Sequence, residues 1–576
     1  MEKFKQFLKN NMNRELALLM LIILIGSFVR FYNLAWDEGW FFHPDERNIA
    51  SAVLNLDPEV GDYNPDFFAY GTLPIYLTRV FSGNDFPQAI LVGRTMSAFF
   101  STLLIPLTYL ITKKALIIID KKKKNQSGLA LFAAVLVAFA PGMIQFAHFA
   151  TYEIFLTFEY MLAIFFAFRV AEKGRLRDYI FLGLALAFAN ATKVVSLSLV
   201  PILFVAHFIY VLTTYYKTRS DIKKSLVKLL LNYRLYLALL ICAVFSIALF
   251  PYLVLDYEAF QGSMNYEGPV ARGELLVFYT QQFKETIPFV YQVVKVFPYI
   301  LGWPVTILGL FSAIYFLLRG IKDVALTLVF RNKKKNINYA ALILSTAAIL
   351  YGGFHFTLYV KWTRYMIPLV PMFIILSVLM LKDLYKIRKI RAVIMPTLVV
   401  ITIIMVVQGL NFFTIYTKPD PRVAAADWAS QNIVTDAQIL AEIYDLGITP
   451  WNGKFPVQNI TLYNFYDLDT PGTTLTLEEL REILADTDYI VVTSNRIYPT
   501  KLRLIEQNPI AGQFYAQLFD GTLGYKQIAE FDRDTVLEDL FSGDEFNGIE
   551  LPATFQYDES FKVFDQPTIL VFAKVN

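Results

Sequence analysis

Cysteine is nearly absent from this chain of 576 residues, since the single one, Cys242, lies in an apolar run. A lone cysteine excludes an internal disulfide and a zinc site built from cysteines. Histidine is scarce too, with four in the chain and none after residue 414. Charged residues make up 18%, compared with about 25% in a typical soluble domain. These shortages argue against a disulfide scaffold and against a chain that is soluble along its whole length.

Apolar and aromatic residues are abundant instead: 56% of the chain is hydrophobic, with 51 Phe and 34 Tyr. This excess indicates that lipid is the solvent for part of the chain. The charge is divided unevenly, because residues 415–576 hold 25 acidic and 11 basic residues while the whole chain has a net charge of +3. We therefore expect a membrane domain over residues 1–414 and a soluble α/β domain over residues 415–576.

About eleven runs have the length and composition of a helix that crosses a bilayer, which needs about 20 mostly apolar residues. They are 15–33, 86–112, 127–148, 153–170, 178–193, 195–216, 231–255, 298–318, 338–358, 364–381 and 391–413. The first run is not followed by a small-residue cleavage site, so it is interpreted as the first spanning helix and not as a signal peptide.

Lys and Arg fall on alternate sides of these runs. Six connecting segments hold 30 of them, namely 1–14, 113–126, 169–178, 217–230, 319–337 and 382–391. Basic loops stay in the cytoplasm. The pattern predicts a multi-pass protein of the plasma membrane with a cytoplasmic N-terminus. An odd number of helices then places residues 415–576 outside the cytoplasm.

The first outer loop, residues 34–86, carries two acidic pairs, Asp37-Glu38 and Asp45-Glu46, and a helical pattern over 48–56. A carboxylate can take the proton from an acceptor hydroxyl that attacks a sugar, while cations stabilise a departing phosphate. A solvated acidic loop is the simpler alternative on these residues alone. A few Arg and Lys also lie on the outer side, where a cation snorkels, pairs with an acid or binds a phosphate. They are Arg30, Arg47, Arg79, Arg94, Arg272, Arg364, Lys193, Lys284, Lys295 and Lys361.

Several motifs occur in a fixed order along the membrane part, and together they resemble those of a known family. They are His43-Pro44-Asp45-Glu46-Arg47, the segment Tyr70 to Tyr76, Val92-Gly93-Arg94, the segment His148 to Glu153, Ala191-Thr192-Lys193, and the segment Lys361 to Pro368. This set resembles the GT-C-fold membrane glycosyltransferases, in particular the protein O-mannosyltransferases and lipid A aminoarabinose transferases.

The resemblance implies a polytopic α-helical membrane enzyme that moves a hexose or pentose from a polyprenyl-phosphate carrier to a hydroxyl of a protein, lipid or glycan, with inversion. It implies that Asp45 and Glu46 are catalytic. Contacts to the donor phosphate would come from Arg47, Arg94, Lys193, Lys361 and Arg364. The substrate pocket would include Tyr70, Tyr76, His148, Glu153 and Tyr365. Aminoarabinose transferases have an arginine three residues after the aspartate, where this chain has Asn48.

No metal site is assigned, because no short ligand spacing is present. His43, His148 and His355 are weak candidates for binding a divalent metal. Glu159 lies six residues after Glu153, which places the two on different faces of one helix. Glu159 is interpreted either as a functional intramembrane acid or as a structural partner of an arginine.

The C-terminal domain shows an Asp420-Pro421 helix start, a capping box from Thr476 to Glu479, and apolar strands at 438–441, 489–493 and 568–574. It has no nucleophile constellation and no glycine-rich phosphate loop, so we expect it to cover the site or to select the acceptor.

Two other functions stay open on the residues. A transporter or flippase of a lipid-linked glycan would also place cations near the membrane, but the sequence shows no repeat between its halves. A membrane-anchored binding protein would leave the outer cations without a role.

Overall fold

The computed structural model describes residues 11–119, 126–216, 221–330, 337–443, 459–470, 476–536, 544–546, 549–551 and 557–575. Contacts divide the chain into two compact units. The first, here called the helical unit, comprises residues 1–34, 45–269 and 288–410. The second, the sheet unit, comprises residues 35–44, 270–287 and 411–576. Two short pieces that lie between predicted membrane helices therefore belong to the sheet unit.

Helices account for the architecture of the helical unit. Those that lie wholly or mostly in it are α2 (Asn11–Phe31), α3 (Pro44–Leu54), α4 (Thr72–Ser82), α5 (Phe86–Ile119), α6 (Ser127–Phe139), α7 (Pro141–Gln145), α8 (Glu153–Lys173), α9 (Leu176–Thr192), η1 (Val194–Leu199), α10 (Pro201–Thr214), α11 (Ile222–Leu230), α12 (Tyr233–Leu249), α13 (Tyr252–Leu255), α14 (Tyr257–Arg272), η4 (Gln292–Val296), α15 (Phe297–Leu301), α16 (Trp303–Phe330), α17 (Tyr339–Phe356), α18 (Thr363–Met366), α19 (Leu369–Leu384) and α20 (Arg391–Phe413).

Each predicted apolar run coincides with one of these helices or with shorter helices in succession. Proline causes several of the breaks, because it has no N–H to donate: Pro141 begins α7 after α6, and Pro201 begins α10 after η1. Among the described residues, seven helices are long and apolar enough to cross a membrane. The predicted polytopic α-helical fold is confirmed, whereas the count of eleven spanning helices is not established.

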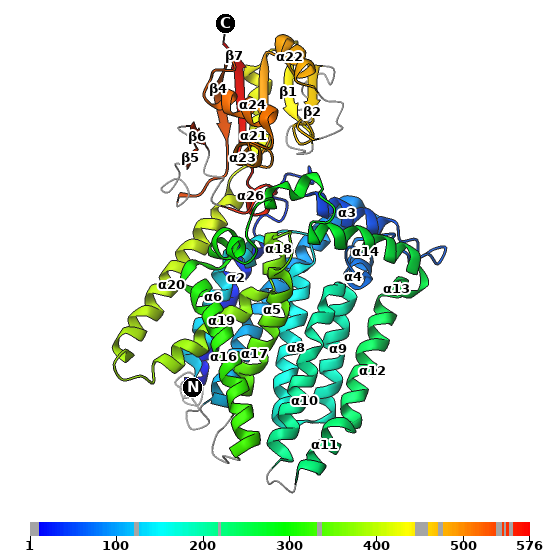
Figure 1. Ribbon diagram of the computed structural model, residues 1–576, viewed down its shortest axis with the longest axis vertical. Helices are drawn as coiled ribbons and strands as arrows, with labels where there is room; N and C mark the ends of the chain where they lie inside the picture. The colour runs from blue at the N-terminus through cyan, green and yellow to red at the C-terminus, as the bar shows by residue number, and fades with distance from the viewer. Residues whose placement is uncertain are drawn as a thin grey trace, which may run out of the picture. The chain divides into compact units, whose positions relative to one another are not determined.

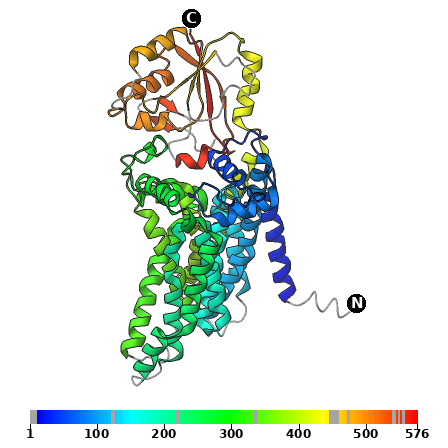
Figure 2. The same ribbon diagram turned by 90° about the vertical axis from the view of Figure 1, so that its right-hand side faces the viewer.

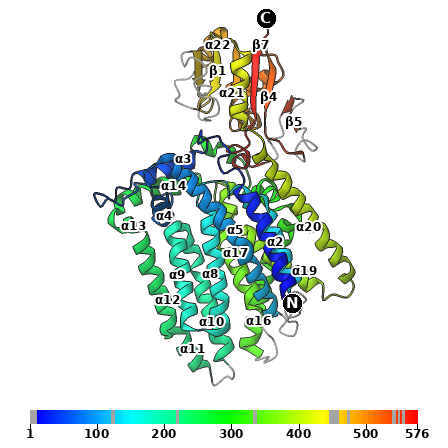
Figure 3. The same ribbon diagram turned by 180° about the vertical axis from the view of Figure 1, so that it is seen from behind.

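The two ends of the helical bundle differ in character. α3, α4 and α14 lie at one end, and α11 lies at the other (Figures 1 and 3). The exposed lysines of α11 are Lys223, Lys224 and Lys228, which fall in a segment predicted to be cytoplasmic. The basic runs 121–124 and 333–335, predicted on the same side, lie outside the described residues. The sidedness of the bundle stays a prediction.

The helix of the first outer loop begins earlier than its pattern predicts. Residues 48–56 have the helical pattern, but α3 starts at Pro44 and ends at Leu54. Proline suits the first helical position because its φ is already helical and its missing N–H would have no partner there. Asp45 and Glu46 consequently lie in the first turn, where the helix dipole favours negative charge.

The sheet unit is built on a five-stranded mixed sheet with the order β2-β1-β3-β7-β4. Its strands are β1 (Ile439–Glu442), β2 (Ile460–Tyr463), β3 (Tyr489–Val492), β4 (Tyr525–Phe531) and β7 (Ile569–Lys574), and β5 (Asp544–Phe546) pairs with β6 (Ile549–Leu551) in a separate ribbon. β1 is parallel to β2 and β3, whereas β7 is antiparallel to β3 and β4. The three predicted strands correspond to β1, β3 and β7, which are neighbours in the sheet.

Helices cover both faces of this sheet. Its helices are α21 (Pro421–Asn432), α22 (Leu477–Asp486), α23 (Tyr498–Arg503), α24 (Pro509–Phe519) and α26 (Glu559–Lys562), with the short turns η3 (Phe278–Phe283) and η5 (Thr414–Thr417). Alternate residues of a strand point to opposite faces. Thus Leu440 packs with α22, α23 and α24, while Ile439 packs with α21 on the other side (Figure 2). The predicted C-terminal α/β domain is confirmed as a fold.

Both predicted helix starts of the sheet unit are confirmed by their caps. The Asp420 carboxylate accepts a hydrogen bond from the backbone N–H of Arg422 at 2.9 Å, with Pro421 at the first helical position. The Thr476 hydroxyl accepts one from the N–H of Glu479 at 3.1 Å. These contacts satisfy N–H groups that have no partner inside the helix.

Candidate active site

Asp45 forms an ion pair with the guanidinium of Arg364, which lies on α18, more than three hundred residues further along the chain. Both side chains are partly accessible, with 29% and 25% of their surfaces exposed. Both belong to the helical unit. An ion pair that keeps this much access to solvent can exchange partners with an incoming anion.

A second ion pair joins Lys193, at the end of α9, to Glu153, at the start of α8, with 3.2 Å between Nζ and Oε1. The Tyr70 hydroxyl donates to the same Oε1 at 2.6 Å. Burial, together with the charge of Glu153, raises the pKa of Tyr70 well above its usual value. The phenol therefore stays protonated and keeps donating to the carboxylate.

Aromatic rings surround the two cations. The ammonium of Lys193 lies 4.6 Å from the centre of the Tyr70 ring and 5.3 Å from that of Tyr365. The guanidinium of Arg364 lies 4.5 Å from the Trp362 ring and 5.7 Å from the Tyr365 ring. Tyr365 thus joins the two ion pairs into one cluster, here called the charged cluster, with Asp45, Glu153, Lys193 and Arg364 as its charged members. It combines two cations that suit a phosphate with two carboxylates that suit a hydroxyl.

Gly71 explains how Tyr70 reaches Lys193. Its N–H donates to the carbonyl of Thr192 at 2.8 Å, so the outer loop runs against the end of α9. A Cβ at this position would lie 2.0 Å from the carbonyl oxygen of Ala191. Only glycine allows the two backbones to approach this closely, and the approach brings Tyr70 and Lys193 together.

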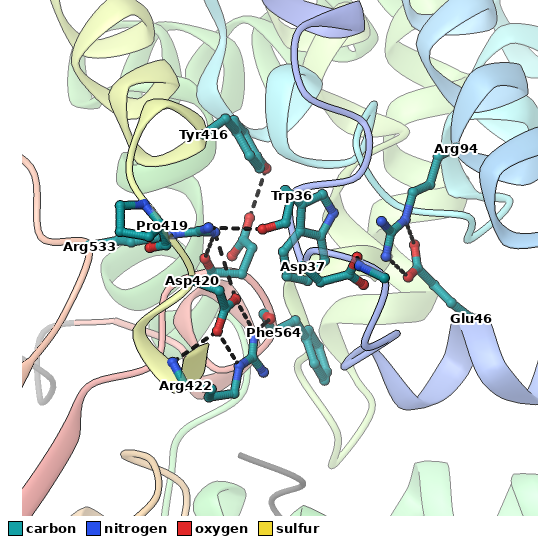
Figure 4. A network of polar contacts seen from close by, with 12 residues as sticks. Trp36, Asp37, Glu46, Arg94, Tyr416, Pro419, Asp420, Arg422, Arg533 and Phe564 are labelled. Atoms are coloured by element: carbon teal, nitrogen blue, oxygen red, sulfur yellow. Dashed lines mark hydrogen bonds and ion pairs between the residues drawn. The ribbon is translucent and has the colours of Figure 1, made fainter. Parts of the chain in front are cut away.

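Glu46 is directed elsewhere than its neighbour Asp45. It is fully buried and accepts from Arg94 Nε at 3.0 Å, from Arg94 Nη2 at 2.5 Å and from the N–H of Ala150 at 2.5 Å (Figure 4). Gly93 makes room for this arrangement, since a Cβ there would lie 2.7 Å from the Cβ of Ala150. Arg94 also donates to the Leu34 carbonyl at 2.8 Å and is 2% exposed. This geometry favours a structural role for the Glu46–Arg94 pair, although both residues were predicted to act on substrates.

Three further predicted residues are Lys361, Tyr76 and Arg47. Lys361 is buried and donates to the Tyr359 carbonyl at 2.5 Å. The Tyr76 hydroxyl donates to the Tyr63 carbonyl at 3.0 Å. Arg47 is half-buried on α3. Their predicted contacts with a substrate remain predictions.

The three candidate metal-binding histidines have different neighbours. The ring nitrogens of His148 lie 2.8 and 2.9 Å from the carbonyls of Ile144 and Tyr32. His355 Nδ1 lies 2.9 Å from the Tyr351 carbonyl, and His43 belongs to the sheet unit. Within the part of the chain that the structure describes, no three His, Cys, Asp or Glu side chains are grouped as metal ligands.

The remaining candidate acids are Asp37, Glu38 and Glu159. Of the rival pair, Asp37 is buried and Glu38 exposed, and both belong to the sheet unit. Glu159 is buried and accepts from the Thr192 hydroxyl at 3.1 Å. The partner of Glu159 in this contact is therefore a threonine, whereas the sequence analysis considered an arginine.

Arg30, one of the outer cations, stabilises a break between two helices. Its guanidinium donates to the carbonyls of Val137 and Ala138, at the end of α6, at 2.9 and 2.8 Å, and to the Ser101 hydroxyl at 2.8 Å. A cation at a helix C-terminus complements the helix dipole. Arg30 therefore has a structural role here.

Sequence reasoning did not single out Trp362 or Gly71 as separate members of the site. Both residues lie inside the quoted motifs. The motifs identified the correct segments, but they did not reveal the ring of Trp362 or the close backbone approach at Gly71. A glycine directly after an aromatic loop residue was an available signal for a close backbone approach.

Comparisons with known proteins agree with the order of the motifs. Residues 88–248 match the family described as dolichyl-phosphate-mannose-protein mannosyltransferase. The resemblance recognised in the sequence is thereby confirmed for this segment, which contains Arg94, Glu153 and Lys193. No curated protein sequence matches the chain.

Solved structures give more distant likenesses. ArnT from Cupriavidus metallidurans, bound to undecaprenyl phosphate, is 14% identical, with 85% of this chain and 94% of that one covered at a TM-score of 0.46. The Archaeoglobus fulgidus oligosaccharyltransferase tethered to an acceptor peptide is 13% identical, with 99% and 89% covered at a TM-score of 0.45. The S. cerevisiae protein O-mannosyltransferase Pmt1–Pmt2 complex, bound to the sugar donor, is 16% identical, with 43% and 34% covered at a TM-score of 0.32. With TM-scores below 0.5, these likenesses support no conclusion about activity.

Proposed function

We propose that this chain is a membrane glycosyltransferase that moves a sugar from a polyprenyl-phosphate carrier to a hydroxyl acceptor. The observation that carries the proposal is the charged cluster, in which two accessible cations and two carboxylates meet beside aromatic rings. The family match over residues 88–248 supports a transferase over a transporter or flippase. The carrier, the sugar (a hexose or a pentose) and the acceptor (protein, lipid or glycan) are parts of the proposal.

In this proposal, Lys193 and Arg364 bind the phosphate of the donor. The incoming phosphate replaces Asp45 as the partner of Arg364, and the Asp45 carboxylate becomes available to the acceptor hydroxyl. Asp45 takes the hydroxyl proton while that oxygen attacks the anomeric carbon, and the bond from this carbon to the phosphate oxygen breaks. A single displacement of this kind inverts the anomeric configuration. The two cations stabilise the negative charge that stays on the phosphate.

The second ion pair keeps the cluster ready for the donor. Glu153 and Tyr70 hold Lys193 in place before the phosphate arrives, so this lysine does not have to be reoriented at the moment of reaction. The aromatic rings of Tyr365 and Trp362 cover part of the surface of the cations, and this partial desolvation strengthens their interaction with a phosphate. This chemistry requires no metal, and a divalent cation is an alternative that the assay below includes.

The topology is proposed from the distribution of basic residues. Residues 1–414 form the transferase domain of the plasma membrane, with the N-terminus in the cytoplasm. The loop 34–86 and the domain 415–576 lie outside, so transfer takes place on the outer face. The domain 415–576 contributes to the choice of acceptor.

The test is transfer from radiolabelled polyprenyl-phosphate sugars in membranes that contain the full-length protein. The donors are dolichyl- and undecaprenyl-phosphate mannose, glucose and aminoarabinose, each with and without a divalent metal chelator. The variant is Asp45→Asn, and the matched control is Glu59→Gln, an exposed acid in the same loop. Glu38→Gln tests the rival acidic pair.

We expect Asp45→Asn to lower transfer at least a hundredfold, within the range that a general base contributes, and Glu59→Gln to leave it unchanged. Arg364→Gln should raise the apparent KM for the donor. Undiminished transfer by Asp45→Asn would remove Asp45 as the base, and loss in Glu38→Gln alone would favour the other pair. No transfer by the wild type from any donor, with flipping of a lipid-linked sugar instead, would favour the transporter.

A further inference from the structure

The segment 35–44 of the first outer loop contacts the rest of the sheet unit at three points, of which Figure 4 shows the one between Trp36 and Arg533. The backbone carbonyl of Trp36 accepts from Arg533 Nη2 at 2.9 Å. The ring of Phe42 lies 3.9 Å from the guanidinium of Arg422. The ring of His43 stacks on Phe564 with 4.0 Å between the centroids and 21° between the planes. The segment is therefore packed into the sheet unit and is not a solvated loop.

The groups that hold this segment are themselves fixed by a buried network. Both carboxylate oxygens of Asp420 accept from Arg422, each at 2.8 Å, and Arg422 also donates to the Phe564 carbonyl at 2.7 Å. Arg533 donates to the carbonyls of Pro419 at 2.8 Å and Asp565 at 2.9 Å. A buried network whose donors and acceptors are paired has a single arrangement, so it presents the three attachment points in fixed positions.

The backbone of the segment supports the same conclusion. Glu38 and Phe41 have φ values of +54° and +53°, a region that residues other than glycine seldom adopt. Such conformations persist where the surrounding contacts determine them. The segment is thus held by its contacts in a conformation that a free loop would leave.

This held segment is joined directly to Asp45. His43 is the last residue before α3, Pro44 begins the helix with a φ fixed by its ring, and Asp45 follows. Only Pro44 separates His43, whose side chain packs in the sheet unit, from Asp45, the proposed base.

We infer that the sheet unit is a positioning element for Asp45, and that His43 and Phe564 form the contact through which it acts. This inference rests on the proposed function. When the segment is released, Asp45 loses its alignment with the acceptor, while Lys193 and Arg364 still bind the donor phosphate. Turnover then falls and donor binding does not change.

The test uses the full-length protein and Phe564, which is half-buried and lies outside the charged cluster. Phe564→Ala removes the ring that His43 stacks on, and Phe564→Tyr keeps it. Phe519→Ala is the matched control, because it removes another half-buried ring of the sheet unit that packs against Tyr498 and Phe572. Chymotrypsin cleavage after Trp40, Phe41 or Phe42 reports release of the segment. The apparent kcat and KM are measured by titrating the donor, beginning with dolichyl-phosphate mannose.

We expect chymotrypsin to cleave Phe564→Ala in this segment at least fivefold faster than the wild type. The kcat of this variant should fall about tenfold, with its KM for the donor within twofold of the wild type. Phe564→Tyr and Phe519→Ala should match the wild type in both measurements. Faster cleavage with an unchanged kcat would overturn the inference, and so would a loss of kcat shared equally by Phe519→Ala. If the wild type transfers sugar from no donor, the proposed function fails, while the cleavage rates still decide whether Phe564 holds the segment. If Asp45→Asn keeps full activity, Asp45 is not the base and the inference is overturned.

Discussion

Replacement of Glu46 by glutamine should destabilise the helical unit, whereas replacement of its neighbour Asp45 by asparagine should not. Glu46 is fully buried and accepts three hydrogen bonds, two of them from a guanidinium that is 2% exposed. The amide of a glutamine would direct its NH2 group at one of these donors. It would also leave the charge of Arg94 buried without a compensating anion.

The structure sets the size of this effect. Breaking a buried ion pair by removing one partner costs about 3–5 kcal/mol, because the other charge stays desolvated. In a unit of this size, such a loss lowers the thermal midpoint by roughly 4–6 °C. Asp45 is 29% exposed in its pair with Arg364, and exposed pairs contribute about 0–1 kcal/mol. Glu46→Gln should therefore lower the stability of the protein, whereas Asp45→Asn should lower its activity.

The assay is thermal unfolding of the detergent-purified full-length protein, followed by gel filtration of the fraction that stays folded. Glu46→Gln should unfold at a clearly lower temperature than the wild type. The double variant Glu46→Gln/Arg94→Met, which removes both charges, should recover part of the loss. A wild-type midpoint for Glu46→Gln together with abolished sugar transfer would refute this reasoning and would return Glu46 to a catalytic role.

Three further outcomes follow from the contacts described above. Tyr70→Phe should lower transfer about tenfold, because a hydrogen bond to a charged group is worth about 1.5–3 kcal/mol, and an unchanged rate in the membrane assay would contradict its role in holding Glu153. Gly71→Ala should reduce transfer more severely than Thr72→Ala, since its Cβ would lie 2.0 Å from the Ala191 carbonyl oxygen, and equal rates would show that the loop can yield. Lys501 donates to the Tyr466 carbonyl at 2.7 Å, and burial lowers its pKa to about 8. Because this value lies below that of an unfolded lysine, the folded state binds fewer protons between pH 8 and about 10.4, and stability rises with pH in that window. Urea unfolding of the full-length protein at pH 7.5 and 9.5 should therefore show a smaller rise for Lys501→Met than for the wild type, and an equal rise would contradict the assignment.

Much of the fold could be read from the sequence because lipid and water impose strong patterns. The apolar runs located the helices of the bundle, and the prolines at 141 and 201 interrupted them as their chemistry requires. The strands at 439–442, 489–492 and 569–574 were found because they are continuous apolar segments in the centre of the sheet. β2 and β4 were not predicted, since their burial patterns are mixed and partly exposed.

The site could be predicted in its residue types but not in its pairing. The order of the motifs selected Asp45, Glu153, Lys193 and Arg364, and the structure brings these four together. It was not evident that Asp45 pairs with Arg364 while Glu46 pairs with Arg94, because adjacent residues of a helix point in directions about 100° apart. The start of α3 decides which carboxylate is buried, and the pattern placed that start four residues late. Long-range partners of this kind depend on tertiary contacts that one sequence does not reveal.

The contact between Arg30 and the end of α6 has a consequence for how the chain is inserted into the membrane during synthesis. The carbonyls that Arg30 binds belong to residues 137 and 138, more than one hundred residues downstream. An arginine at the centre of a spanning helix disfavours insertion by about 2.5–3.5 kcal/mol, and the cost is smaller in the last turn, where Arg30 lies. The helix predicted to cross first therefore enters the bilayer before its charge has a partner, and we expect it to settle only once α6 has arrived. Arg30→Leu should ease the early step and weaken the finished bundle, so the membrane-inserted nascent chain and the mature protein should respond to this substitution in opposite directions.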